Sequence, residues 1–277
     1  MKPCLHPSIV EGVCDLDSYL DVAKVAGFEF VEVDWTWLDT AADKYGESYL
    51  CRAFSRRSLT LASFGLPVDL YCDEALFQSQ LQELPTAAER AVRLGATRSC
   101  TWLWPAIDEV PVPYASRLAR RIRECAGALI PYGIRLGLEF VGPHHLRDKR
   151  FPFVQNLQDL IVYLEAINMP NVGILLDSYH WYTAEVPIEE ILSLKAHQIV
   201  HVHINDTDAL PSQARDFERL LPGDGRIELG TFLLGLKTVG YTGPVSLEVL
   251  HTSPLAERPE DIPARAHTKL SEMLDSI

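Results

Sequence analysis

The chain has 277 residues and a mass of 31.1 kDa, a length that suits one α/β barrel or two domains of about 140 residues each. Hydrophobic residues make up 47% of the chain and charged residues 23%, which excludes a disordered protein and supplies a large core. The 25 Lys and Arg against 38 Asp and Glu give a net charge of −13, which repels a phosphodiester backbone, so we expect no nucleic acid partner.

The sequence also bears on compartment and partners. No apolar run approaches the roughly 18 residues that span a bilayer, and the first residues lack the pattern of a signal peptide. We therefore expect a soluble, cytoplasmic protein with no membrane partner. The six cysteines form no CxxC pair, so reduced and mostly buried thiols are expected. The sequence leaves the oligomeric state open, a homo-oligomer included.

Short runs rich in Val, Ile, Leu and Phe alternate with segments of helical period, a pattern typical of repeated βα units. Strands are predicted at residues 3–7, 28–34, 59–66, 97–104, 134–141, 172–179, 199–205 and 244–250. Helices are predicted at residues 16–26, 41–58, 75–94, 113–132, 157–167, 188–196, 229–239 and 260–274. Several of these helices end at a glycine that can adopt the left-handed conformation, namely Gly27, Gly95, Gly133 and Gly240. Eight βα units predict a single-domain (β/α)8 TIM barrel over residues 1–277.

The two longest irregular segments cover residues 142–156 and 206–227. Both follow predicted strands, and in a barrel both would lie over the C-terminal mouth, where active sites are built. Long loops at that mouth indicate a covered pocket.

Four polar residues stand near the ends of four consecutive predicted strands: Glu139, Asp177, His203 and Glu248. Such strand ends meet at one site in a parallel barrel. Three buried carboxylates together are costly without a cation, and this donor set suits one divalent ion, Mn²⁺ or Zn²⁺ foremost, with Co²⁺ or Mg²⁺ as alternatives. For any one of the acids alone, a strand-end carboxylate that caps a helix or pairs with Lys is the competing interpretation.

Three more polar residues lie close to these strand ends. His180 follows Asp177 by three residues, and either binds a substrate oxygen or packs among aromatic residues. His201 shares the strand parity of His203 and is expected one layer deeper, behind the ligands or in the core. Arg219 precedes a turn rich in Gly and Pro and either places a fixed cation beside the site or lies on the surface.

Together these residues resemble the sugar phosphate isomerase/epimerase superfamily, which has the xylose isomerase-like TIM barrel. Within it the chain resembles most the inosose (2-keto-myo-inositol) isomerases. The resemblance is strongest between residues 131 and 250, where it rests on LEFVGP at 138–143, LDSYHWY at 176–182, VHIND at 202–206, RLLPGDG at 219–225 and GYTGPVSLEV at 240–249.

The resemblance implies that Glu139, Asp177, His203 and Glu248 bind the metal, and that Glu139 and Glu248 also act as the catalytic acid and base. It implies that His180 and Arg219 hold substrate oxygens, one layer outward from the ligands. The N-terminal half matches only in outline. There His6, Glu32, Trp35, Phe64, Trp102 and Trp104 fall near strand ends, and we expect His6 and Trp104 to contact substrate, although aromatic residues also fill barrel tops.

One stretch departs from the pattern. Residues 144–153, with Arg147, Lys149 and Arg150, are longer and more basic than expected for an inosose isomerase. These cations either engage an anionic group of the substrate or remain solvated.

We therefore expect a metal-dependent isomerase or epimerase of a keto-sugar or keto-cyclitol, with glutamate-mediated proton transfer through a metal-bound enediolate. An inosose or dehydroshikimate type dehydratase on the same barrel is the main alternative, because the same enolate can expel a β-hydroxyl group. The acidic net charge and the lack of extra strand-end histidines argue against an apurinic endonuclease. A non-catalytic sugar-binding barrel would have no reason to keep all four ligands.

Overall fold

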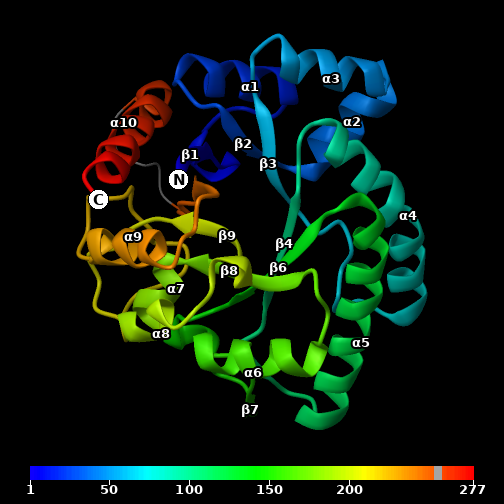
Figure 1. The fold of residues 1–277 in the computed structure, drawn as a ribbon, viewed down its shortest axis with the longest axis vertical. Coiled ribbons are helices and arrows are strands. Elements are labelled where there is room, and N and C mark those ends of the chain that lie inside the picture. Colours follow the sequence, from blue (N-terminus) through cyan, green and yellow to red (C-terminus); the bar gives the residue numbers. More distant parts are fainter. Residues whose placement is uncertain (253–257) are drawn as a thin grey trace.

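Eight parallel strands close into a barrel in the computed structural model, which describes residues 1–252 and 258–277 (Figure 1). The strands are β1 (Lys2–Leu5), β2 (Phe30–Val33), β3 (Thr60–Gly65), β4 (Arg98–Leu103), β6 (Arg135–Phe140), β8 (Val172–Asp177), β9 (Ile199–Ile204) and β10 (Pro244–Leu247). Their order around the barrel follows the chain, and β10 closes on β1. The predicted barrel and all eight of its strands are confirmed.

Helices surround the barrel (Figure 1). They are α1 (Leu16–Val25), α2 (Trp35–Tyr45), α3 (Glu47–Ser55), α4 (Glu74–Arg93), α5 (Pro111–Leu129), α6 (Leu157–Ile167), α7 (Ser178–Thr183), α8 (Ile188–Leu192), α9 (Leu229–Thr238) and α10 (Ile262–Asp275). Short 3-10 turns are η1 (Pro7–Ile9), η2 (Ile130–Tyr132), η3 (His144–Leu146), η4 (Ala196–Gln198) and η5 (Pro259–Asp261). The four glycines predicted to end helical segments all have positive φ, between 67° and 98°.

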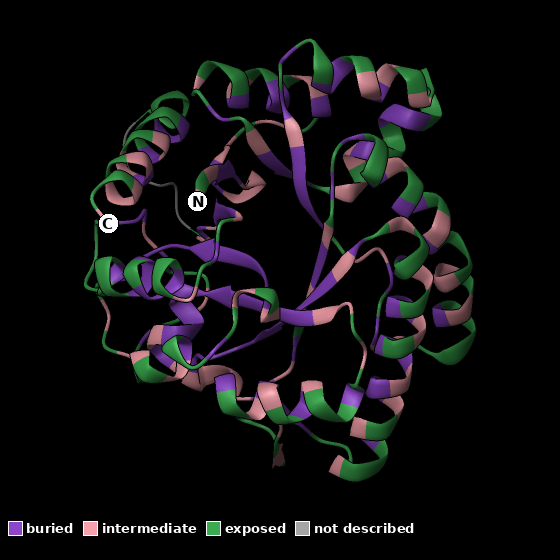
Figure 2. Ribbon diagram, in the orientation of Figure 1, coloured by how far each residue is buried: buried purple, intermediate pink, exposed green. Residues whose placement is uncertain are grey.

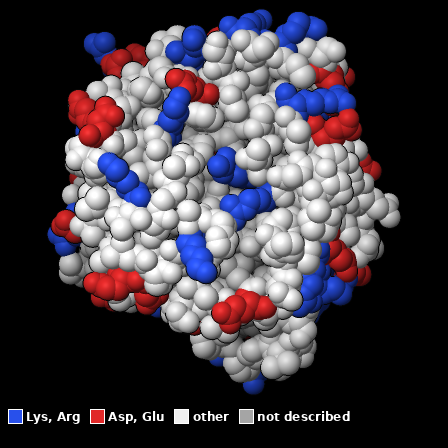
Figure 3. Space-filling model, in the orientation of Figure 1, with Lys and Arg blue, Asp and Glu red and all other residues white. Residues whose placement is uncertain are grey.

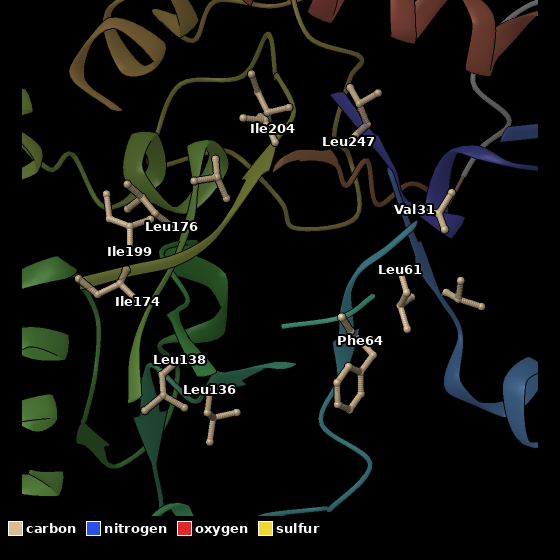
Figure 4. Packing of buried hydrophobic residues seen from close by; sticks show 14 of the residues in the cluster. Val31, Leu61, Phe64, Leu136, Leu138, Ile174, Leu176, Ile199, Ile204 and Leu247 are labelled. Carbon is tan, nitrogen blue, oxygen red and sulfur yellow. The ribbon is translucent and has the colours of Figure 1, made fainter. Parts of the chain in front are cut away.

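The main core lies between the strands and the helices. The helices bury the face turned to the barrel and expose the other (Figure 2). Successive strand residues point to opposite faces, so Leu136 and Leu138 lie on the other face of β6 from Glu139. Figure 4 shows these leucines with Ile174, Leu176 and other buried strand residues of this core. The alternation leaves the inner face of the barrel free for polar side chains.

Two predicted elements are wrong in extent. The segment predicted as one helix over 41–58 is two helices, because Asp34 caps α2 directly after β2 and Gly46, with φ of 81°, separates α2 from α3. The strand predicted over 172–179 stops at Asp177, because the Asp177 side chain accepts a hydrogen bond from the backbone N–H of Tyr179 and so caps α7.

The segment 142–156 is more ordered than predicted. Within it β7 (Phe151–Pro152) pairs antiparallel with β5 (Ala106–Ile107), which follows β4. This small sheet fixes the segment above the C-terminal end of the barrel.

Two register shifts interrupt the barrel ladders. Val31 pairs with Leu61, but the next residue, Glu32, pairs with Ser63. A similar shift in β9 pairs Ile174 with Ile199 and Leu175 with His201. Such bulges redirect side chains, and here each directly precedes a polar residue of the barrel interior.

In the described ranges, none of the helices has both the length and the apolar character needed to cross a membrane. On the face shown in Figure 3, acidic and basic side chains are interspersed around the rim, and Lys and Arg lie near its centre.

Candidate active site

The structure brings the four predicted ligands together at the C-terminal end of the barrel. Glu139 lies on β6, Asp177 ends β8, His203 is on β9 and Glu248 directly follows β10. Each offers one oxygen or nitrogen atom, and these atoms all lie within 4.8 Å of one another. Glu139, Asp177 and His203 are buried, and Glu248 is half-buried.

Hydrogen bonds fix Asp177 at the end of its strand. Its Oδ1 accepts from the backbone N–H of Tyr179 at 2.6 Å, and the amide nitrogen of Asn205 donates to both carboxylate oxygens, at 3.0 and 3.2 Å. The same Asn205 nitrogen donates to the backbone carbonyl of Glu248 at 3.0 Å. Asn205 therefore ties β9 to the ends of β8 and β10.

His203 faces the carboxylates with its Nδ1. This atom is 3.3 Å from Glu248 Oε2, 3.8 Å from Glu139 Oε1 and 4.0 Å from Asp177 Oδ2. Neither His203 Nδ1 nor Glu139 Oε1 makes a hydrogen bond to any residue in the described parts of the chain, although both atoms are buried. Buried polar atoms without partners are costly. An imidazole nitrogen and carboxylate oxygens that converge in this way suit a divalent cation.

The electrostatics of the cluster separate its two glutamates. Burial raises the pKa of Glu139 well above its ordinary value, and the charges of Glu248 and Asp177 raise it further. Burial also opposes ionisation of Glu248, but His203 and Arg219 outweigh it and hold the pKa of Glu248 well below its ordinary value. In the absence of an ion, burial and the acidic neighbours thus favour the protonated form of Glu139, and His203 and Arg219 favour the ionised form of Glu248.

Arg219 lies closer to the ligands than predicted. Its Nη1 donates to Asp177 Oδ2 at 2.8 Å and to Glu248 Oε2 at 2.9 Å, and its Nη2 donates to Asp216 Oδ1 at 2.7 Å. The expectation that it lies one layer outward from the ligands is wrong, since it contacts two of them directly. Its guanidinium also packs over the Tyr179 ring, 4.8 Å from the centroid, so the side chain is buried and fixed.

His180 lies beside this group. Its Nδ1 accepts from the backbone N–H of Gly142 at 3.3 Å, and its Nε2 is 3.8 Å from Glu139 Oε2 and 3.4 Å from Arg219 Nη2. A Cβ atom at position 142 would come within 2.6 Å of the His180 carbonyl oxygen. Glycine there lets the chain after β6 approach α7.

Two cavities flank the carboxylates. One of about 330 Å³ is lined by Trp104, His180, Arg219 and the exposed Phe217, among others. The other, of about 320 Å³, is lined by His6, Trp35 and His203 and the residues around them. Trp102, Glu139 and Glu248 line both. His6 and Trp104, the predicted substrate contacts, therefore open onto different cavities on either side of the cluster.

The PGDG turn at 222–225 is organised by Asp206. Its Oδ2 accepts from the backbone N–H groups of Gly223 and Gly225, and its Oδ1 from that of Ile227, all at 3.0 Å. A Cβ atom on Gly225 would lie 2.4 Å from the same carboxylate. This turn holds the segment that carries Arg219 over the barrel mouth.

The basic segment is largely occupied with its own surroundings. Arg147 donates to the backbone carbonyl of Gly142 at 2.6 Å. Lys149 lies 5.3 Å from the centroid of a Trp104 ring and 3.6 Å from an Asp108 oxygen. Arg150 packs on Phe151. None of the three lines the cavity that holds His180 and Arg219.

Sequence reasoning missed three residues of the site. Asn205 contacts Asp177, and Asp216 contacts Arg219. Asn205 stands in the VHIND segment, but nothing in the local sequence of either residue indicates these contacts. Glu32 was named only as a strand-end residue, but its Oε1 lies 2.9 Å from His201 Nε2 and 3.1 Å from His203 Nε2. The shared strand parity of His201 and His203 was the only local indication that the two imidazoles lie near each other.

Comparisons with known proteins agree with the barrel fold. The xylose isomerase-like TIM barrel family matches residues 20–273. The inosose isomerase of Bacillus subtilis is 32% identical over 120 residues, which is 43% of this chain and 41% of that protein. The ketose 3-epimerase of Arthrobacter globiformis is 26% identical over 188 residues, 66% of this chain and 60% of that protein. The matches span about two fifths to three fifths of these relatives.

Solved structures show the same fold. A xylose isomerase domain protein from Alicyclobacillus acidocaldarius is 48% identical, with a TM-score of 0.97, and the match covers 99% of this chain and 98% of that one. The IOLI protein, crystallised with a zinc atom, is 21% identical with a TM-score of 0.84, and the match covers 100% of this chain and 99% of that one. The chain belongs to the xylose isomerase-like TIM barrel family.

Proposed function

We propose that this protein is a metal-dependent isomerase or epimerase of a keto-sugar or keto-cyclitol. The observation that carries the proposal is the convergence of Glu139, Asp177, His203 and Glu248, with two buried donor atoms that lack partners among the described residues. The names of the inosose isomerase and ketose 3-epimerase relatives support the same reaction class.

The four side chains would hold one divalent ion, Zn²⁺ or Mn²⁺ foremost. The zinc atom of the IOLI structure, which shares the fold, supports this choice. Bound there, the ion would act as a Lewis acid that polarises a substrate carbonyl and acidifies the neighbouring C–H bond.

The two glutamates would move the protons. Glu248, whose pKa is lowered by His203 and Arg219 against the effect of burial, would remove the proton next to the carbonyl. Glu139, which lines the same two cavities as Glu248, would return a proton. Proton return on the opposite face inverts the carbon centre, and return to the adjacent carbon moves the carbonyl.

The remaining contacts would orient the substrate. His180 Nε2 and the Arg219 guanidinium lie at the edge of the cavity shared with Glu139 and Glu248, where both can donate to hydroxyl groups. Trp104 would contact the substrate from one cavity and His6 from the other. Trp102 and Trp104 stand edge to face, with ring centroids 4.5 Å apart, and offer an apolar wall to the C–H face of a sugar ring.

A substrate panel tests the proposal. Protein loaded in turn with Zn²⁺, Mn²⁺, Co²⁺ or Mg²⁺ is incubated with ketohexoses, ketopentoses, inososes and their phosphates, and products are followed by NMR and by enone absorbance. We expect an epimer or positional isomer, lost in Glu139→Gln and kept in the control Glu83→Gln, which alters an exposed residue. An enone product, detected by its absorbance, would instead establish dehydratase activity. The 3-dehydroshikimate dehydratase of Pseudomonas aeruginosa, a relative of this chain, is named for that activity. A loaded protein without turnover on any of these sugars would contradict the proposal.

A further inference from the structure

A carboxylate from another part of the barrel contacts the back of His203. Glu32 lies on β2, three strands away from β9 around the barrel. Its Oε1 is 3.1 Å from Nε2 of His203, whose Nδ1 faces the carboxylate cluster. Both side chains are buried.

The same Glu32 oxygen is shared with a second imidazole. His201 Nε2 lies 2.9 Å from Glu32 Oε1, and His201 Nδ1 has no hydrogen-bond partner among residues 1–252 and 258–277. His201 is fully buried. The hydrogen bond to Glu32 therefore offsets the cost of burying the His201 imidazole in the barrel.

Hydrogen-bond chemistry fixes the state of the two rings. An ionised carboxylate only accepts hydrogen bonds, so each facing Nε2 must carry a proton. In a neutral imidazole with the proton on Nε2, the lone pair is on Nδ1. With a metal in the cluster, that lone pair of His203 would be directed at the ion among Glu139, Asp177 and Glu248.

The backbone holds Glu32 in place for this role. The register shift between Val31 and Glu32 sets the pairing of Glu32 with Ser63, and the hydroxyl of the buried Tyr19 donates to the backbone carbonyl of Glu32 at 2.7 Å. The shift in β9 falls directly before His201. Both irregularities lie where they bring the carboxylate and the imidazoles to one point.

We propose that Glu32 is a positioning residue that fixes the tautomer and ring orientation of His203 so that Nδ1 binds the metal, and that His201 holds Glu32 in place. The proposal rests on the proposed function in that it assumes a metal at the four-residue cluster. A carboxylate that accepts from the far nitrogen of a ligating histidine typically changes metal affinity by about 10- to 100-fold.

A second metal bound by Glu32, His201 and His203 is the competing interpretation, since their donor atoms also lie within 4.8 Å of one another. The distances of 2.9 and 3.1 Å are those of ordinary hydrogen bonds. A single oxygen that accepts from two N–H groups gives Nε2 of both imidazoles a partner without an ion between them, and this favours the positioning role.

Metal affinity in the full chain is the first test. The dissociation constants of Zn²⁺ and Co²⁺ are measured by competition with a chelator for the wild type, Glu32→Ala, Glu32→Gln and the control Glu29→Gln, which alters an exposed residue before the same strand. We expect Glu32→Ala to weaken binding by about 10- to 100-fold, and Glu32→Gln, which keeps an acceptor oxygen, to weaken it less. The control should bind as the wild type does.

The histidine tautomers are the second test, and they do not depend on activity. In ¹⁵N-histidine spectra of the metal-free chain, assigned with His201→Gln and His203→Gln, Nε2 of both rings should carry a proton, and Glu32→Ala should remove the Nε2 proton of His203 in part. Unchanged affinity and an unchanged tautomer in a folded Glu32→Ala protein would overturn the proposal. Two ions per wild-type chain, reduced to one in Glu32→Gln, would overturn it in favour of a second metal site. A wild type that binds no ion would contradict the proposed function, whereas the tautomer assay would still test Glu32.

Discussion

Nη1 of Arg219 donates to Oδ2 of Asp177 across 2.8 Å, and both side chains are buried. The same nitrogen is 2.9 Å from Oε2 of Glu248. One guanidinium therefore compensates two of the acids that the proposed metal site requires, and burial together with Tyr179 packing keeps it in place. Arg219 is as much part of the electrostatic structure of the site as a contact for substrate.

Arg219→Ala should destabilise the metal-free protein by about 3–5 kcal/mol, because removing one partner leaves buried carboxylates uncompensated. Urea unfolding measures this change. Arg93→Ala is the matched control, since Arg93 makes an exposed pair with Glu89 one helical turn away, and it should cost under about 1 kcal/mol. An Arg219→Ala protein no less stable than the control would show that the ion pairs contribute little.

Glu74 should contribute stability that disappears in acid. It lies on α4 and accepts from Arg120 and Arg121 of α5, and from Gln78. These hydrogen bonds lower the pKa of Glu74 to about 2. Because the folded-state pKa is below the unfolded one, the contribution is present above the ordinary glutamate pKa and is lost as the pH falls toward about 2.

Comparison of the wild type with Glu74→Gln between pH 6 and pH 2 checks this prediction. The difference in unfolding free energy between the two proteins should shrink steadily as the pH falls. A difference that stays constant over this range would mean that the contacts of Glu74 with α5 do not depend on its charge.

Turnover in D₂O should place deuterium on the substrate carbon next to the carbonyl, since a proton held by a carboxylate exchanges with water before it is returned. Any sugar that the panel identifies serves for this experiment, read by NMR at early turnover. Glu248→Gln should abolish both turnover and exchange, with some loss of metal. Product free of solvent deuterium would favour hydride transfer or internal proton return, and exchange that persists in Glu248→Gln would assign the base elsewhere.

The fold was predictable because the strands have apolar residues on the helix-facing side and the helices start and stop at recognisable positions. Gly27, Gly95, Gly133 and Gly240 mark four of these boundaries. The prediction of one helix over 41–58 missed the start of α2, because Asp34 caps α2 immediately after β2 and no turn residues separate the two elements. The pairing of β5 with β7 brings together segments over 40 residues apart, and pairing at that separation leaves no local signal.

The four candidate ligands were predictable because each interrupts an apolar strand, and parallel strand ends meet at one place. The contacts around them were not. The position of Arg219 depends on the loop that Asp206 organises, and the contact between Glu32 and His203 depends on two register shifts. Neither the loop path nor a bulge can be read from residue periodicity.

The location of the metal is the most direct test of the account, because it requires no knowledge of the substrate. Crystals of the purified protein, soaked or grown with Zn²⁺ or Mn²⁺, are measured at the absorption edge of that metal. We predict one anomalous peak per chain, about 2.0–2.3 Å from atoms of Glu139, Asp177, His203 and Glu248. A well-occupied ion bound elsewhere, with none among these four side chains, would contradict the proposed mechanism.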